Sequence, residues 1–269
     1  MGERVRTADI DLWTDRRGTG PEVLLIAGLG DPVEAWGAQL DGLSDRYHLT
    51  AFDNRGMGRS PMRPEPVTVS ALADDAAGLL RALDIPSAHV AGFSGGSIIA
   101  QELTLRHPEF VRSLVLVSTW ARCDALARAM VTSWRWMAEL APSERAFLEA
   151  FYAWIYTPRA HADGTVDRII DEVLAFPYQP SLEAVQGMID AFAVHDTTDR
   201  LPDIAVPTLV LAGGVDISAP PRLGRAVADA IPGARFEVME EEAHQPFQEA
   251  PEAFNARVDA FWREVDGGS

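Results

Sequence analysis

Hydrophobic positions in the first part of the chain follow two alternating patterns. The run Val23-Leu24-Leu25-Ile26-Ala27 is continuously apolar and ends at a glycine, which is typical of a strand buried on both faces of a sheet. Residues 70–83 instead carry apolar side chains at helical spacing and predict an amphipathic helix. The same two patterns place a hairpin within 3–15, strands at 47–52, 88–93 and 113–117, and helices at 34–43 and 95–106. This alternation predicts an α/β fold, a mostly parallel sheet with helices on both faces.

The alternation stops after residue 119. The next segment has no strand pattern, and its helical stretches lie near 123–140, 143–156, 165–176 and 181–194. Strands then return at 208–212 and 234–239, with helices at 221–231 and 251–264. We therefore expect residues 1–119 and 203–269 to form one core domain, and residues 120–202 to form a helical cap inserted between two strands.

The cap segment is rich in aromatic residues, holding 11 of the 22 in the chain. This excess predicts an apolar ligand cleft beneath the cap, lined by Trp134, Trp136 and Trp154 of the cap and by Phe93 of the core. For each cap residue the alternative is packing within a small core of the cap itself.

A candidate nucleophile follows the strand at 88–93. There the chain reads Gly92-Phe93-Ser94-Gly95-Gly96, a G-x-S-x-G pattern. Because a helix follows at once, the turn must be sharp, and it would hold Ser94 in strained backbone geometry at the carboxyl edge of the sheet. The start of a helix favours developing negative charge, so the Gly95 N–H is a candidate oxyanion donor. The pattern also fits a Gly/Ser-rich packing turn with no catalytic role.

A serine nucleophile needs a base and a group that orients the base. His244 follows the last predicted strand, so its loop lies at the same sheet edge as Ser94. Asp216 follows the strand at 208–212 and is the candidate orienting acid, with Asp124 as its competitor. The other five histidines are expected at sheet edges, at a helix end or in the cap: His48, His89, His107, His161 and His195.

The order Ser94, Asp216, His244, on an alternating sheet with a late helical insertion, resembles the α/β-hydrolase fold family over nearly the whole chain. Segment 53–60 is similar to the family's D-x-R-G-x-G-x-S turn, and further matches are His107-Pro108 and 204–210. The resemblance implies a serine-nucleophile esterase or lactonase. A serine nucleophile does not fit the haloalkane dehalogenase and epoxide hydrolase branches, which attack with aspartate.

The chain departs from this family at the end of its first buried strand. The family usually has His-Gly at this point, whereas this chain has Ala27-Gly28-Leu29-Gly30. The resemblance assigns the second oxyanion donor to this loop, and the Leu29 N–H can still serve because the donor is a backbone group. The loop lacks a side chain that commonly braces it, and losing one oxyanion donor costs roughly 10²–10³ in rate.

Composition excludes several kinds of chemistry. The chain has 23 basic residues, all of them arginine, and 40 acidic residues, which gives a net charge of −17. Without lysine there is no Schiff-base lysine and no Walker-type phosphate loop. Cys123 is the only cysteine, so no cysteine-rich metal site can form. We interpret this cysteine as structural. Any cation that meets a substrate carboxylate must be arginine, with Arg55, Arg122 and Arg135 the nearest candidates by sequence.

These observations predict a serine hydrolase that cleaves a carboxylic ester, lactone or thioester of a moderately apolar small molecule, with no metal or organic cofactor. Acyl transfer, elimination or cofactor-free perhydrolysis by the same residues is the alternative, and a low-turnover ligand-binding protein is the third interpretation. The acidic balance argues against nucleic-acid partners, and no apolar segment predicts a membrane span or leader, so a cytoplasmic location is expected. A homodimer is left open.

Overall fold

Eight strands form one sheet in the order β1-β2-β4-β3-β5-β6-β7-β8 in the computed structural model, which describes residues 2–267. The first two strands form an antiparallel hairpin, and β2 also runs antiparallel to β4; all other neighbours are parallel. The strands are β1 (Glu3–Arg6), β2 (Asp11–Arg17), β3 (Glu22–Ile26), β4 (His48–Phe52), β5 (Ala88–Phe93), β6 (Val111–Val117), β7 (Thr208–Gly213) and β8 (Arg235–Met239). The loops that leave the parallel strands therefore meet at one edge of the sheet.

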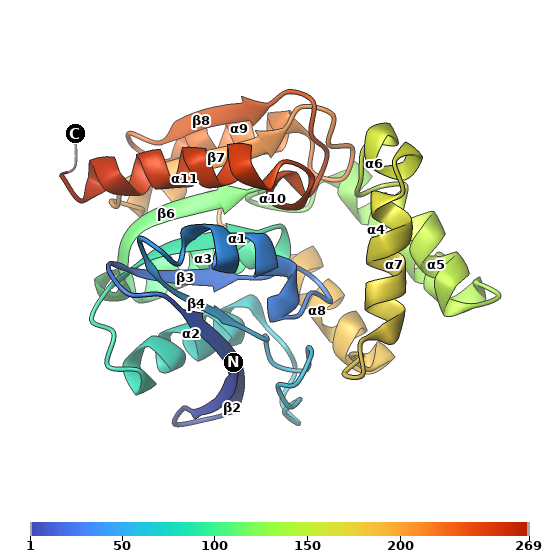
Figure 1. The fold of residues 1–269 in the computed structure, drawn as a ribbon, viewed down its shortest axis with the longest axis horizontal. Coiled ribbons are helices and arrows are strands. Elements are labelled where there is room, and N and C mark those ends of the chain that lie inside the picture. The colour runs from blue at the N-terminus through green and yellow to red at the C-terminus, as the bar shows by residue number, and fades with distance from the viewer. Residues whose placement is uncertain (1, 268–269) are drawn as a thin grey trace.

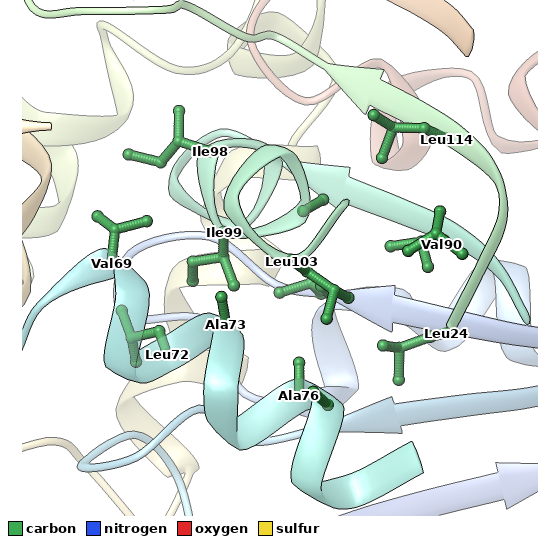
Figure 2. Close-up of a cluster of buried hydrophobic side chains, with 14 of the residues drawn as sticks. Leu24, Val69, Leu72, Ala73, Ala76, Val90, Ile98, Ile99, Leu103 and Leu114 are labelled. Carbon is green, nitrogen blue, oxygen red and sulfur yellow. The ribbon is translucent and has the colours of Figure 1, made fainter. Parts of the chain in front are cut away.

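Helices cover both faces of this sheet (Figure 1). Leu24 and Ile26 of β3 point to one face and Val23 and Leu25 to the other, as the two-residue period of a strand requires, and all four are buried. One face packs against α2 (Val69–Ala82), α3 (Gly95–Arg106) and α9 (Pro221–Ala230), and the other against α1 (Gly37–Leu43) and α11 (Pro251–Val265). Figure 2 shows the first of these layers, where side chains of α2 and α3 meet those of the strands. The predicted parallel sheet with helices on both faces is confirmed.

The segment between β6 and β7 is helical, as predicted. It contains α4 (Ala125–Leu140), α5 (Glu144–Tyr152), α6 (Pro158–Ala162), α7 (Thr165–Ala175) and α8 (Leu182–Val194). Side-chain oxygens of Asp124, Ser143, Thr157 and Ser181 accept backbone hydrogen bonds at the starts of α4, α5, α6 and α8, which fixes where these helices begin. Helices α4 to α7 lie beyond the sheet edge that carries the loops (Figure 1).

Two parts of this helical segment pack differently. Met188, Ala191 and Phe192 of α8 join the hydrophobic core beneath the sheet, so α8 ties the cap to the core. Helices α5 and α7 share a separate small core that includes Leu148 and Ile170. The cap therefore has a core of its own, which was the alternative interpretation of its aromatic residues.

A few predicted boundaries differ from the observed elements. The helix expected at 34–43 begins as a 3₁₀ turn, η1 (Val33–Trp36), before α1. The helices α6 and α10 (Pro246–Glu249) were not predicted, because four or five residues are too few to show a helical period. Within residues 2–267, no helix is both long and apolar enough to cross a bilayer.

Candidate active site

Ser94 occupies the sharp turn between β5 and α3. Its backbone has φ 52° and ψ −121°, a region that non-glycine residues rarely adopt. The turn closes tightly because two flanking residues lack side chains: a Cβ on Gly92 would lie 2.3 Å from the Gly96 carbonyl oxygen, and one on Gly96 would lie 2.2 Å from that of Ile26. The strained turn presents the Ser94 side chain at the sheet edge where the strand loops meet.

His244 reaches Ser94 from the loop after β8. Its Nε2 lies 2.9 Å from Ser94 Oγ. The loop is held on two sides, because the His244 N–H donates to the Ile155 carbonyl of the cap (3.0 Å) and the Ser118 hydroxyl donates to the His244 carbonyl (2.8 Å). The imidazole is buried, with the Phe93 ring 5.1 Å away between ring centroids. The base candidate is therefore fixed by both the cap and the core.

Asp216 holds the other side of the imidazole. Its Oδ2 lies 2.8 Å from His244 Nδ1, and its Oδ1 accepts backbone N–H groups of Ser218 (2.7 Å) and Ala219 (2.8 Å). Burial raises the pKa of the Asp216 carboxyl, but His244 and the two N–H groups outweigh burial and hold that pKa below its ordinary value. An ionised Asp216 favours a proton on Nδ1, which leaves Nε2 to accept the Ser94 hydroxyl proton.

Asp124, the competing acid, has a different role. Its Oδ1 accepts the Ala127 N–H (2.8 Å) and caps α4, and its Oδ2 pairs with Arg222 (2.8 Å). The alternative that Asp124 orients the base is therefore wrong.

The two residues predicted to supply oxyanion N–H groups line the cavity that contains Ser94. The Gly95 N–H is the first of α3 and so lacks an intrahelical acceptor, and the Leu29 N–H belongs to the loop after β3. Both residues line the cavity that contains Ser94, and within the described part of the chain neither N–H donates to a protein acceptor. Both residues therefore lie in the wall of the cavity that contains Ser94, and their role as oxyanion donors stays a prediction.

The loop after β3 is braced by residues that the sequence analysis did not single out. The Asn54 side-chain amide donates to the Ala27 carbonyl (3.1 Å), and the Asp53 carboxylate accepts the N–H groups of Val33 and Arg59, both at 2.7 Å. These contacts hold the loop where the histidine usual in the family is missing. The signal was present in the sequence, because both residues begin the 53–60 turn.

A cavity of about 1030 Å³ lies between the core and the cap and opens onto Ser94. Phe93 and Trp134 line it, as predicted. Trp136 and Trp154 do not, which corrects the prediction. Two residues along α4 correspond to about 200° of rotation, so Trp136 points away from Trp134 and is 61% exposed. Trp154 packs in the cap's own core instead. Aromatic residues that line the cavity without having been predicted to do so are Trp120, Phe147, Phe151, Tyr152, Tyr156, Phe176 and Phe192.

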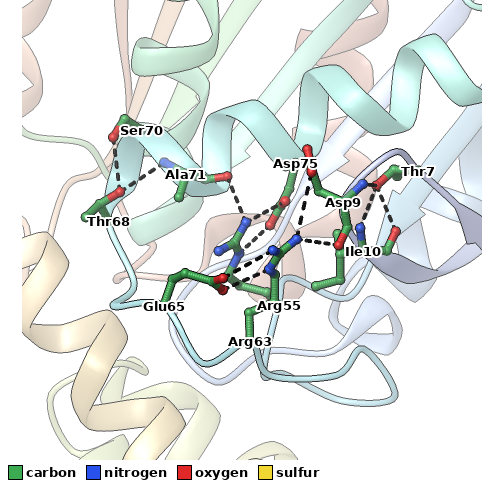
Figure 3. A network of polar contacts seen from close by, with 10 residues as sticks. All are labelled: Thr7, Asp9, Ile10, Arg55, Arg63, Glu65, Thr68, Ser70, Ala71 and Asp75. Carbon is green, nitrogen blue, oxygen red and sulfur yellow. Dashed lines mark hydrogen bonds and ion pairs between the residues drawn. The ribbon is translucent and has the colours of Figure 1, made fainter.

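Two of the three arginines proposed as candidate cations, Arg55 and Arg135, are paired with acidic side chains. Arg55 is buried in a two-pronged ion pair with Asp75 (2.5 and 2.6 Å; Figure 3). Arg122 is exposed in an isolated β-bridge with Asp196. Arg135 lines the cavity but is paired with Asp190 of α8.

The remaining candidates also have assignable environments. Burial raises the pKa of the Cys123 thiol, which lies 3.7 Å from the Phe192 carbonyl and fits a structural role. His89 was expected at a sheet edge, but it lies fully buried in β5, where its ring contacts Ser113. Residues 2–267 contain no cluster of three or more His, Cys, Asp or Glu side chains that could hold a metal ion.

Asp31 is an acid that the sequence analysis did not consider. It lies on the loop after β3, two residues beyond Leu29, and lines the cavity beside Ser94. Burial raises the pKa of its carboxyl to about 7, although His244 and the Gly28 backbone N–H oppose that rise. The site thus contains two carboxyls with opposite pKa shifts, Asp216 and Asp31.

The chain is similar in sequence and in structure to proteins of one family. A family profile described as alpha/beta hydrolase fold matches residues 21–251. The protein named "Putative carbamate hydrolase RutD" of Azorhizobium caulinodans is 34% identical, over 96% of this chain and 97% of that relative. The pimeloyl-(acyl-carrier protein) methyl ester esterase of Neisseria meningitidis is also 34% identical, over 92% and 93%. The crystal structure of the enol-lactonase from Burkholderia xenovorans LB400 superposes with a TM-score of 0.85 and 25% identity, over 97% and 99%.

Proposed function

The chain belongs to the alpha/beta hydrolase fold family, and we propose that it is a serine hydrolase that cleaves carboxylic esters, lactones or thioesters through an acyl-enzyme. One observation carries the proposal: Ser94 Oγ, the His244 imidazole and the Asp216 carboxylate form a continuous hydrogen-bonded chain, with links of 2.9 and 2.8 Å, at the end of an apolar cavity. Such a chain activates a serine hydroxyl for attack on an acyl carbon.

The geometry leads to the following steps. His244 Nε2 takes the Ser94 proton as Oγ attacks the acyl carbon, and the ionised Asp216 stabilises the imidazolium that forms. The carbonyl oxygen gains negative charge and is bound by the Leu29 and Gly95 N–H groups. His244 then gives its proton to the leaving group. A water molecule, activated by the same imidazole, releases the acyl group and restores Ser94.

The cavity supports a moderately apolar substrate. Its wall is dominated by aromatic and aliphatic side chains, and at about 1030 Å³ it lies at the upper end of the roughly 300–1,000 Å³ typical of small-molecule sites. Relatives include a methyl ester esterase and an enol-lactonase, which supports ester or lactone substrates. A relative carries the name of a carbamate hydrolase, so a carbamate belongs among the compounds tested.

The test is hydrolysis of p-nitrophenyl butyrate, an aliphatic lactone and a p-nitrophenyl carbamate by the wild type and by Ser94→Ala and His244→Ala. We expect both variants to lose at least about 10³-fold in kcat on the ester while remaining folded. Ser44→Ala, at the end of α1, and His107→Ala, at the end of α3, are the matched controls and should retain wild-type rates. Ester hydrolysis that persists in Ser94→Ala would overturn the proposal. A wild type that acylates but does not hydrolyse would favour acyl transfer.

A further inference from the structure

The Asp31 carboxyl lies beside the reacting groups. Its Oδ2 is 3.1 Å from the point where a Cβ on Gly28 would lie, and an edge atom of the Phe93 ring is 3.0 Å from the same point. The absence of a side chain at Gly28 therefore gives the carboxyl its place. The carboxyl and the Phe93 ring thus border the same space over Gly28, and His244 is close enough for its charge to affect the pKa of Asp31.

Most other charged groups of the cavity wall are paired with an opposite charge, whereas the Asp31 carboxyl has only the Gly28 backbone N–H. Glu34 pairs with Arg59 (2.7 Å), Arg168 with Glu172 (2.7 Å), and Arg135 with Asp190. Glu144 also lines the cavity but is exposed at the start of α5. Within residues 2–267, no arginine hydrogen-bonds the Asp31 carboxyl.

An acid in an apolar wall without a cation is costly to ionise, and burial accordingly raises the pKa of Asp31 to about 7. The titratable groups that face Asp31 are His244 from the loop after β8, and Tyr152 and Tyr156 from the cap. None of them is a permanent positive charge, so an ionised Asp31 is left for a cationic ligand to neutralise.

The surroundings of Asp31 favour an ammonium group. Tyr152 and Tyr156 are buried in the cavity wall with their ring centroids 5.2 Å apart, and Phe93 lines the same cavity. Aromatic faces around a carboxylate attract an organic cation through both the ring quadrupole and the opposite charge. A neutral hydroxyl would gain only the hydrogen bond.

We propose that Asp31 is a specificity-determining residue that binds an organic ammonium group of the substrate, so that the preferred substrates are apolar esters with a positive charge a few atoms from the scissile bond. This inference rests on the proposed function, since it deepens the use of the same cavity. It also has a consequence for the rate. An ionised Asp31 repels the negative charge that develops on the substrate carbonyl oxygen at the neighbouring Leu29 N–H, and a bound cation removes that repulsion. The positive charge of such a substrate should therefore raise kcat as well as lower KM.

The test compares butyrylcholine with 3,3-dimethylbutyl butyrate, which have nearly the same shape and differ by one positive charge. At pH 8 we expect the wild type to prefer butyrylcholine by about 10- to 100-fold in kcat/KM, the range of one charge-assisted contact. Asp31→Asn should reduce this preference to within about threefold while still hydrolysing the neutral ester. Glu144→Gln, which neutralises the exposed acid at the cavity mouth, is the matched control and should keep the preference.

A preference lost equally in Glu144→Gln and Asp31→Asn would assign it to the overall negative potential and overturn the role of Asp31. No preference in the wild type would overturn it as well. Binding to Ser94→Ala separates this inference from the proposed hydrolysis. By titration calorimetry, this variant should bind butyltrimethylammonium at least about 10-fold more tightly than 3,3-dimethylbutanol, and adding Asp31→Asn should remove the difference. Equal affinities would contradict the ammonium site whether or not the protein hydrolyses esters.

Discussion

The pKa values of two carboxyls in the site are shifted in opposite directions by their surroundings. Asp216 is buried but has three hydrogen-bond donors, the imidazole and two backbone N–H groups, which keep its pKa low. Asp31 is also placed in an apolar wall, but its protein surroundings supply no cation, and its pKa rises to about 7. A titratable group whose pKa is strongly shifted beside reacting atoms is typical of a functional site.

Asp216→Asn should lower kcat by about 10³- to 10⁴-fold, because an amide in place of the carboxylate no longer stabilises the imidazolium or the productive tautomer. Asp124→Asn is the matched control. Its side chain caps α4, and asparagine caps a helix as well as aspartate does, so both rate and stability should stay close to those of the wild type. Steady-state kinetics on p-nitrophenyl butyrate measure the rates of the two variants. A large loss in Asp124→Asn with little loss in Asp216→Asn would assign the orienting role to Asp124.

Asp31→Asn should stabilise the protein at high pH. Because the folded pKa of Asp31 is raised, the folded state keeps a proton between about pH 4 and about pH 7 that the unfolded chain has lost, so the wild type loses stability as pH rises through this window. We expect the variant to exceed the wild type by roughly 1–3 kcal/mol at pH 8 in free energy of unfolding, with little difference near pH 4. Urea denaturation at the two pH values measures this, and a difference independent of pH would refute it.

Among individual residues, the sequence predicted the place of those that lie close to the end of a strand. Ser94 directly follows a predicted strand, and Asp216 and His244 lie a few residues beyond theirs, so the parallel sheet brings all three to one edge. Asp31 and Asn54 follow strands too, but nothing in their local pattern shows that one faces the cavity and the other the Ala27 carbonyl. Trp136 shows the opposite limit, because its helix was predicted and the face that meets the cavity was not.

At the scale of elements, one of the contacts between the cap and the core centres on Arg59. Arg59, from the turn after β4, lies 4.8–5.0 Å from the ring centroids of Trp13 in β2 and of Phe176 and Tyr178 between α7 and α8. It also pairs with Glu34 (2.7 Å). This cation among three rings fixes the α7–α8 loop, whose Phe176 lines the cavity, against the core.

Arg59→Ala should therefore loosen the α7–α8 loop. We expect amide hydrogen exchange across residues 176–182 to become at least about 10-fold faster. Each cation–π contact contributes about 0.5–2 kcal/mol, and the substitution removes three of them. KM for an apolar ester should rise because one wall of the cavity becomes mobile. Arg63→Ala, which removes a more exposed arginine paired with Glu65 (Figure 3), should leave exchange in 176–182 unchanged. Unchanged exchange in Arg59→Ala would contradict this role.

The elements themselves were largely predictable. Strand β5 and helix α3 match their predicted bounds, because their apolar patterns are long and a glycine pair marks the boundary between them. Helix α6 was missed because long-range contacts support it: the Glu249 carboxylate accepts the N–H (2.8 Å) and hydroxyl (2.7 Å) of Thr157, the residue that caps this helix. A local pattern cannot show a partner 92 residues away.

At the scale of the whole molecule, charge and composition bear on both the substrate and the measurement. A net charge of −17 attracts cations over the entire surface, which agrees in sign with the ammonium proposed at Asp31 and is why that test needs Glu144→Gln as a control. The chain also has no lysine, and its one cysteine is buried. Neither lysine nor an exposed cysteine therefore competes with Ser94 for an electrophile.

Mass spectrometry of the folded protein after reaction with a fluorophosphonate shows whether Ser94 is an activated nucleophile. We expect one phosphonyl group per chain, located on the peptide that contains Ser94, and no adduct on Ser94→Ala or on the urea-unfolded wild type. No adduct on the folded wild type, or an adduct that persists in Ser94→Ala, would contradict it.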